Sequence, residues 1–308
     1  MRAPAVVAVA VVAALVAVLA TLGVQRWTAE EPDRPSDRLA GLVDDGYAAS
    51  LFMEQAPDGL PDDLAERMEL VLTEDSWTDA QARDVSAALV DAGAASAGGL
   101  DEEGAAVAGA VVAAAPDEVH PGLRAAVLNV LAQRLPAVHR SLTGVEMGAD
   151  TGSGAGLELA EEDLVATLRA AGQDRGAAVS FVETYGDWAA GLLAVELDGV
   201  SEIPDAIRQR PDLGRGPGRA LVEVLEGCQD CGSLETTVRG TVGLAYDQAV
   251  LQAYVAAGDQ RFPTLVAPSG DAVLLDLPLT AEQAAEYADF RETTPATSVL
   301  RNEFERAR

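Results

Sequence analysis

The sequence predicts an all-α protein, with a single N-terminal transmembrane helix followed by a multi-helix body arranged as an orthogonal array or a bundle. Residues 3–24 carry no charged side chain, and a helix of that length, at about 1.5 Å per residue, matches the hydrocarbon thickness of a bilayer. The remaining chain is rich in Ala and Val, and aromatic residues make up only 4% of the sequence. This composition favours closely packed helices over strands.

The apolar segment 3–24 is expected to be an uncleaved anchor that makes the contact with the lipid bilayer. Trp27 follows it, where an amphipathic ring would meet the headgroups. A cleaved signal peptide is an alternative, because Arg2 gives a basic start and residues 18–20 form an acceptable cleavage triplet. The apolar run is longer than signal peptides require. A buried core helix is the third interpretation.

The orientation of the body at the cell membrane is indicated by two conflicting features. Basic residues are more frequent after the segment, at Arg26, Arg34 and Arg38, than before it, at Arg2, which favours a cytoplasmic body. The very short N-terminal tail favours the opposite orientation. We expect a single-pass protein with an extracytoplasmic body.

The net charge of −29 restricts the partners of the body. A strongly acidic surface repels phosphate backbones, so nucleic-acid binding is not expected, and it also repels anionic lipids. The sequence contains no lysine. Walker-type phosphate loops and Schiff-base chemistry both need that amine and are therefore excluded.

Turn residues and glycines divide the chain into six segments. These are an anchor or signal at 1–27, a spacer at 28–37, a helical domain at 38–142, a glycine-rich linker at 143–160, a second helical domain at 161–258, and a loop with C-terminal helices at 259–308.

Five helices are predicted in the first helical domain. A helix at 38–55 is capped by Ser36 or Asp37, and a second begins at Pro61. A capping box at 78–81 opens a third helix, which ends near residue 97. Helices at 101–115 and 121–135 follow.

In the second half, glycine and proline separate the predicted helices. Helices at 161–171 and 174–197, the latter capped by Asp174, precede a break at 214–218. A short helix at 219–226 and a long one at 233–257 come next. Residues 262–279 form a loop or a small β-hairpin. A second capping box at 280–283 opens a helix that runs to residue 291, and a last short helix follows Pro295.

Two stretches between residues 119 and 190 carry a resemblance. They are Val119-x-Pro121-x-x-Arg124 leading to Pro136-x-Val138-His139, and Leu157-Glu158-Leu159 followed by Asp163-Leu164, Asp174 and Tyr185. Their order resembles the helical region of uncharacterised actinobacterial proteins associated with WXG-type (type VII) secretion substrates. The resemblance covers about 70 residues and implies a helical module without assigned activity. A membrane helix stands where that family would have a WXG-type hairpin.

Residues 150–153, Asp-Thr-Gly-Ser, match the active-site loop of pepsin-like aspartic proteases. That mechanism needs two carboxylates that share a proton. No second motif of this kind occurs in the chain, and the surrounding residues are glycine-rich. A polar loop is therefore the preferred interpretation, and Asp150 remains the candidate for an alternative carboxylate-dependent hydrolase.

Cys228 and Cys231 are the two cysteines of the chain. A zinc site would need two more ligands, and a thioredoxin-like redox pair would need a βαβ context. We expect a local disulfide formed in an oxidising compartment. Reduced structural thiols are the alternative.

His120 and His139 are expected at helix ends rather than in a metal site, because neither has a Cys or second His at ligand spacing. The sequence therefore predicts no catalytic residue, cofactor or metal. The function that remains is a protein-interaction or scaffold module on a membrane anchor, with an unidentified protein partner. The alternatives are a membrane-tethered hydrolase and a secreted helical protein with a cleaved signal.

Overall fold

The computed structural model describes residues 35–94, 102–145, 157–228, 232–275, 278–294 and 296–306. These residues form thirteen α-helices and two short 3₁₀ helices, with no β-strand among them. The predicted all-α class is therefore confirmed. The predicted membrane helix at residues 3–24 lies outside this set, and no helix within the set is long and apolar enough to cross a bilayer.

The first half of the described chain contains six α-helices and one 3₁₀ helix. They are α2 (Pro35–Asp44), the 3₁₀ helix η1 (Ala48–Phe52), α3 (Leu64–Thr73), α4 (Asp79–Gly93), α5 (Glu102–Ala113), α6 (Arg124–Ala132) and α7 (Leu135–Thr143).

The second half contains the two longest helices of the described chain. Its helices are α8 (Glu161–Ala171), α9 (Arg175–Leu197), α10 (Ile203–Arg208), α11 (Asp212–Gly227), α12 (Gly232–Ala256), the 3₁₀ helix η2 (Pro263–Leu265), α13 (Ala281–Thr293) and α14 (Ala296–Arg306).

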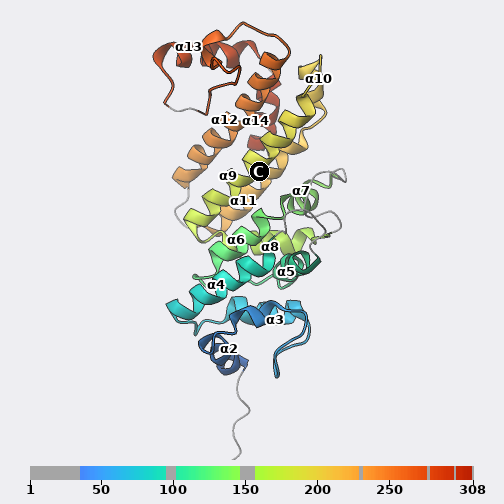
Figure 1. The fold of residues 1–308 in the computed structure, drawn as a ribbon, viewed down its shortest axis with the longest axis vertical. Helices are drawn as coiled ribbons and strands as arrows, with labels where there is room; N and C mark the ends of the chain where they lie inside the picture. Colours follow the sequence, from blue (N-terminus) through green and yellow to red (C-terminus); the bar gives the residue numbers. More distant parts are fainter. Residues whose placement is uncertain are drawn as a thin grey trace, which may run out of the picture.

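The helices follow one another along a single long axis, from α2 at one end to α13 at the other (Figure 1). Most packing joins helices that are close in sequence, such as α4 with α6, α6 with α9, and α9 with α12. After α13 the chain turns back along the stack, so that α14 packs on α10, α11 and α12. One hydrophobic cluster extends from Leu39 to Phe304. The predicted linker at 143–160 falls mostly outside the described residues, so the division into two domains stays a prediction.

Three predicted helix starts are confirmed by their caps. Thr78 and Thr280 form capping boxes with the glutamines three residues later. The side chain of Asp174 accepts a hydrogen bond from the backbone N–H of Ala177 at the start of α9. These caps satisfy backbone N–H groups that have no partner within the helix.

Two helix boundaries predicted before residue 65 are wrong. The helix predicted at 38–55 ends at Asp44, because Gly46 adopts a positive φ of 83° and turns the chain into η1. The next helix does not begin at Pro61. Asp63 caps it by accepting from the N–H groups of Ala65 and Glu66, so α3 starts at Leu64.

The predictions for 121–135 and 214–218 also need correction. The first segment is helical only from Arg124 to Ala132, and α7 then starts at Leu135 with Pro136 in its first turn. The second segment is not a break: residues 214–218 lie inside α11. Contacts from other helices explain this second difference, as described below.

Of the two interpretations of residues 262–279, the loop is closer to the structure. The described residues there form a single antiparallel bridge, between Val266 and Ala272, instead of paired strands. The side chain of Gln248 on α12 donates to the carbonyl of Ala272 and accepts from the N–H of Leu274. The loop is thus paired with side-chain amides of α12 in place of a second strand.

A buried arginine closes the loop between η1 and α3. Arg67 donates from Nε to the carbonyl oxygen of Leu51 (2.8 Å), from Nη1 to that of Pro61 (2.5 Å) and from Nη2 to that of Met53 (2.5 Å). Its side chain has no solvent exposure. Burial lowers the pKa of Arg67, and the nearby carboxylates of Asp62 and Asp63 oppose that shift.

The helices α8 and α11 pack with their backbones in contact. A Cβ atom on Gly172 would lie 2.4 Å from the carbonyl oxygen of Val224, and one on Gly227 would lie 1.8 Å from that of Arg169. No other residue type fits at either position without moving a helix. Glycine therefore sets the separation of this pair.

Candidate functional site: a buried polar network around His139

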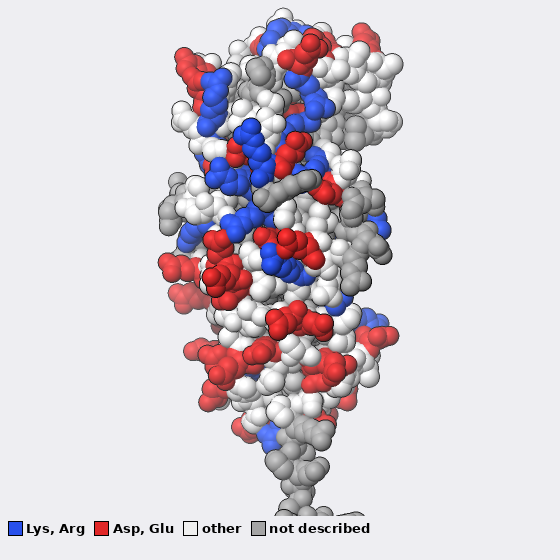
Figure 2. Space-filling model, turned by 180° about the vertical axis from the view of Figure 1, so that it is seen from behind, with Lys and Arg blue, Asp and Glu red and all other residues white. Residues whose placement is uncertain are grey.

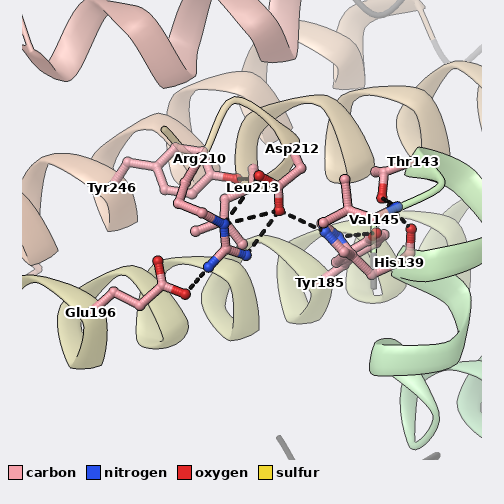
Figure 3. A network of polar contacts seen from close by, with 9 residues as sticks. All are labelled: His139, Thr143, Val145, Tyr185, Glu196, Arg210, Asp212, Leu213 and Tyr246. Carbon is pink, nitrogen blue, oxygen red and sulfur yellow. Dashed lines mark hydrogen bonds and ion pairs between the residues drawn. The ribbon is translucent and has the colours of Figure 1, made fainter. Parts of the chain in front are cut away.

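A network of polar side chains lies where α7, α9, α11 and α12 meet (Figure 3). Its members are His139 of α7, Tyr185 and Glu196 of α9, Arg210 and Asp212 at the start of α11, and Tyr246 of α12. His139, Asp212 and both tyrosines are buried. Buried polar groups need hydrogen-bond partners, because an unpaired one costs the free energy of its lost hydration.

His139 is the centre of the network. Its Nε2 lies 3.1 Å from Oδ2 of Asp212, and its Nδ1 lies 2.9 Å from the hydroxyl oxygen of Tyr185. A carboxylate only accepts, so Nε2 carries the proton that is donated to Asp212. Burial, followed by the proximity of Tyr246 and Asp212, raises the pKa of Tyr185 well above its ordinary value. The Tyr185 hydroxyl thus keeps its proton, and it can donate a hydrogen bond to Nδ1 of His139 when that nitrogen carries no proton.

Asp212 joins His139 to a cation. Nη2 of Arg210 lies 2.8 Å from Oδ2 of Asp212, and Nε of Arg210 also donates to this carboxylate. Burial alone would raise the pKa of Asp212, but the hydrogen bonds from His139 and Arg210 and the charge of Arg210 lower it well below its ordinary value. Arg210 in turn pairs with Glu196, which is partly exposed. The chain of contacts therefore runs from the surface to the buried imidazole.

The space around the imidazole is filled. The Trp188 ring lies 5.4 Å from that of His139, centroid to centroid. A Cβ atom on Gly216 would be 2.4 Å from the Tyr185 hydroxyl and 2.7 Å from Nδ1 of His139. A surface hollow of ≈ 290 Å³ lies instead between α6 and α9, and none of the network residues lines it.

A histidine oriented by a carboxylate is the general-base arrangement of many hydrolases. Such a base must reach a nucleophile or a substrate. Both imidazole nitrogens of His139 are already bonded, and the ring has no solvent exposure. The geometry supports a structural role, in which the network links α7 to α9 and α11.

Tyr246 completes the network by supplying a hydrogen bond that the backbone of α11 lacks. Pro217 lacks the N–H that would donate to the carbonyl of Leu213, four residues earlier in the helix. The hydroxyl of Tyr246 donates to that carbonyl oxygen instead, at 2.5 Å. A side chain of α12 thus replaces the missing backbone hydrogen bond.

This replacement gives a double-mutant prediction. Tyr246→Phe should lower the free energy of unfolding by about 1–3 kcal/mol, because the buried Leu213 carbonyl is left without a partner. In a Pro217→Ala background the same substitution should cost clearly less, since alanine supplies the missing N–H. Urea denaturation of the four proteins measures both costs. Equal costs in the two backgrounds would show that Tyr246 does not replace the hydrogen bond that is missing at Pro217.

A second polar cluster fastens α14 to α12 and α13. Arg301 pairs with Asp247, donates to the carbonyl of Gly243 (3.2 Å) and lies 3.0 Å from the hydroxyl of Tyr287. Tyr287 itself donates to Asp247. Burial and the negative charge of Asp247 raise the pKa of Tyr287 to about 12, so it remains a donor at neutral pH.

Comparison with known proteins leaves these sites without an assignment by similarity. No family model, curated protein or solved structure matches the chain. The fold and the site define a stacked α-helical protein with a buried polar network that joins its helices. The resemblance of residues 119–190 to actinobacterial proteins of type VII secretion stays a prediction.

Of the residues singled out in the sequence, the structure describes His120, His139 and Cys228. His139 is not at a helix end as expected, but inside α7 and fully buried. His120 precedes α6, where its Nδ1 accepts from the N–H of Gly122. Asp150 and Cys231 lie outside the described residues. The disulfide of Cys228 with Cys231 therefore stays a prediction, as does any role of Asp150.

Proposed function

We propose that the chain is a single-pass membrane protein whose acidic helical stack is an extracytoplasmic protein-interaction or scaffold module. The arrangement of the helices supports this proposal. Stacked helices that pack mainly on their near neighbours give an extended surface, and helical-repeat proteins use such surfaces to bind partners. The anchoring part of the proposal comes from the apolar sequence of residues 3–24.

The distribution of charge is the observation that carries the binding role. Residues 35–118 contain 19 acidic residues and 3 arginines, of which Arg67 is buried. Eleven arginine–carboxylate ion pairs among the described residues join side chains beyond residue 160. In Figure 2, acidic side chains dominate the end of the stack nearest α2, whereas arginines gather toward the other end. The α2–α5 end therefore offers many carboxylates to a protein with a basic surface.

Site-specific photo-cross-linking in cells tests the binding role. A photoreactive residue at Asp84 or Asp91, both exposed on α4, should give a discrete adduct that disappears as the ionic strength rises. The same residue at Glu292, exposed on α13, is the matched control. If the positions on α4 yield no adduct beyond that control, the proposed binding surface is wrong.

Membrane fractionation and sequencing of the mature N-terminus test the anchoring role. Retention in the membrane with an intact N-terminus supports a single-pass anchor. A cleaved, released chain supports the secreted alternative. Acid protease activity that is lost on Asp150→Asn would support the hydrolase alternative instead.

A further inference from the structure

The first two turns of α11 are made of residues that are unfavourable inside a helix. Gly214, Gly216, Pro217 and Gly218 all lie within this segment. Glycine and proline are the two residue types with the lowest helix propensity, and Pro217 also removes one backbone hydrogen bond. Residues 212–218 are nevertheless helical. Groups outside the segment must therefore stabilise the helix here.

One face of this segment is held by the polar network. Asp212 receives hydrogen bonds from His139 and Arg210, and Tyr246 donates to the carbonyl of Leu213. Gly216 lies against His139 and the Tyr185 hydroxyl so closely that no side chain would fit between them.

Another part of the segment is held by α14. A Cβ atom on Gly214 would lie 2.4 Å from the carbonyl oxygen of Leu300, so the two backbones are in contact. Leu300 has no solvent exposure. Nη2 of Arg215 forms an ion pair with Glu303, at 3.1 Å. The helix α14 therefore packs directly on the two turns that are weakest in isolation.

The ion pair that attaches α14 to α12 includes buried polar atoms that destabilise the docked state. The ion pair between Arg301 and Asp247 is buried on the Asp247 side. Oδ1 of Asp247 and Nε of Arg301 are both buried without a hydrogen-bond partner among the described residues. Such groups oppose docking, because each loses its hydration without full compensation.

We propose that α14 is a strap that controls the conformation of residues 212–218 and, through them, the link between His139 and Asp212. With α14 docked, the segment is helical and Asp212 is positioned to accept from His139. With α14 released, Gly214–Gly218 loses its support, the segment unwinds, and the hydrogen bond between His139 of α7 and Asp212 of α11 is lost. Coupling of this kind is reciprocal, so disruption of the network must also loosen α14.

Hydrogen exchange on the full-length protein in detergent tests the strap. Leu300→Ala loosens α14, and Leu89→Ala, a change at an equally buried leucine of α4, is the matched control. We expect the amides of residues 215, 216, 218 and 219 to exchange about tenfold faster or more in Leu300→Ala, with α3 to α6 unchanged. In Leu89→Ala the exchange of 215–219 should remain slow. Unchanged exchange at 215–219 in Leu300→Ala, or the same acceleration in both variants, would overturn the proposal.

The reciprocal experiment covers the case in which Leu300→Ala does not fold. Tyr185→Phe removes one hydroxyl of α9 from the network without touching α14. Its control is Tyr254→Phe, on α12 and outside the network. We expect faster exchange in residues 299–305 of Tyr185→Phe only. Slow exchange there would show that the network and α14 are independent, and the strap would be wrong. Neither experiment depends on membrane anchoring or on a protein partner.

Discussion

Replacing Asp212 with alanine is expected to lower the free energy of unfolding by about 3–5 kcal/mol, as for other broken buried ion pairs. The carboxylate accepts from His139 and from Arg210, and both side chains lose their main buried acceptor when it is removed. Urea denaturation at neutral pH measures the loss. Asp205→Ala is the control, because Asp205 forms an exposed pair with Arg208, and it should cost about 0–1 kcal/mol.

The cost of Asp212→Ala should also depend on pH. Asp212 has a lowered pKa in the folded protein, so its contribution is present above the unfolded value of about 3.9 and is lost as the pH falls below it. The difference in stability between wild type and variant should therefore shrink on acidification. A difference that stayed constant from neutral to strongly acidic pH would show that Asp212 does not act as a charged acceptor.

Replacing Arg67 with alanine is the second large effect, again of about 3–5 kcal/mol, because three carbonyl groups, in one buried and two part-buried contacts, lose a charged donor. The loss of stability should be largest between η1 and α3, where Leu51, Met53 and Pro61 supply those carbonyls. Thermal unfolding measures the global effect, and hydrogen exchange of residues 48–63 measures the local one.

The control for Arg67 is another arginine of the same region. Arg83 on α4 is exposed and donates to the carbonyl of Asp79 within its own helix. Arg83→Ala should change the stability by about 0.5 kcal/mol or less, as is usual at the surface. Similar losses for the two variants would mean that the carbonyl contacts of Arg67 contribute little.

Features encoded locally could be predicted from the sequence. The capping boxes at Thr78 and Thr280 and the cap at Asp174 are contacts between residues three positions apart, so the sequence contains both partners side by side. The all-α class followed from composition and helical spacing in the same way.

Features that depend on distant residues could not be predicted. The glycines and proline at 214–218 indicate a break by propensity, but contacts from Tyr246 and Leu300 keep the segment helical. The partners of His139 are 46 and 73 residues away along the chain. A single sequence carries no signal for such pairs. The proline without an N–H was a usable hint that some donor must reach Leu213.

The backbone contact between α8 and α11 has a consequence for the size of the side chains that the interior needs. At Gly172 and Gly227 the two helices leave no room for a side chain between them. Where helices pack this closely, few bulky residues are needed, which agrees with an aromatic content of only 4%. The contact between α8 and α11 is therefore made by backbone atoms at these points, rather than by bulky side chains.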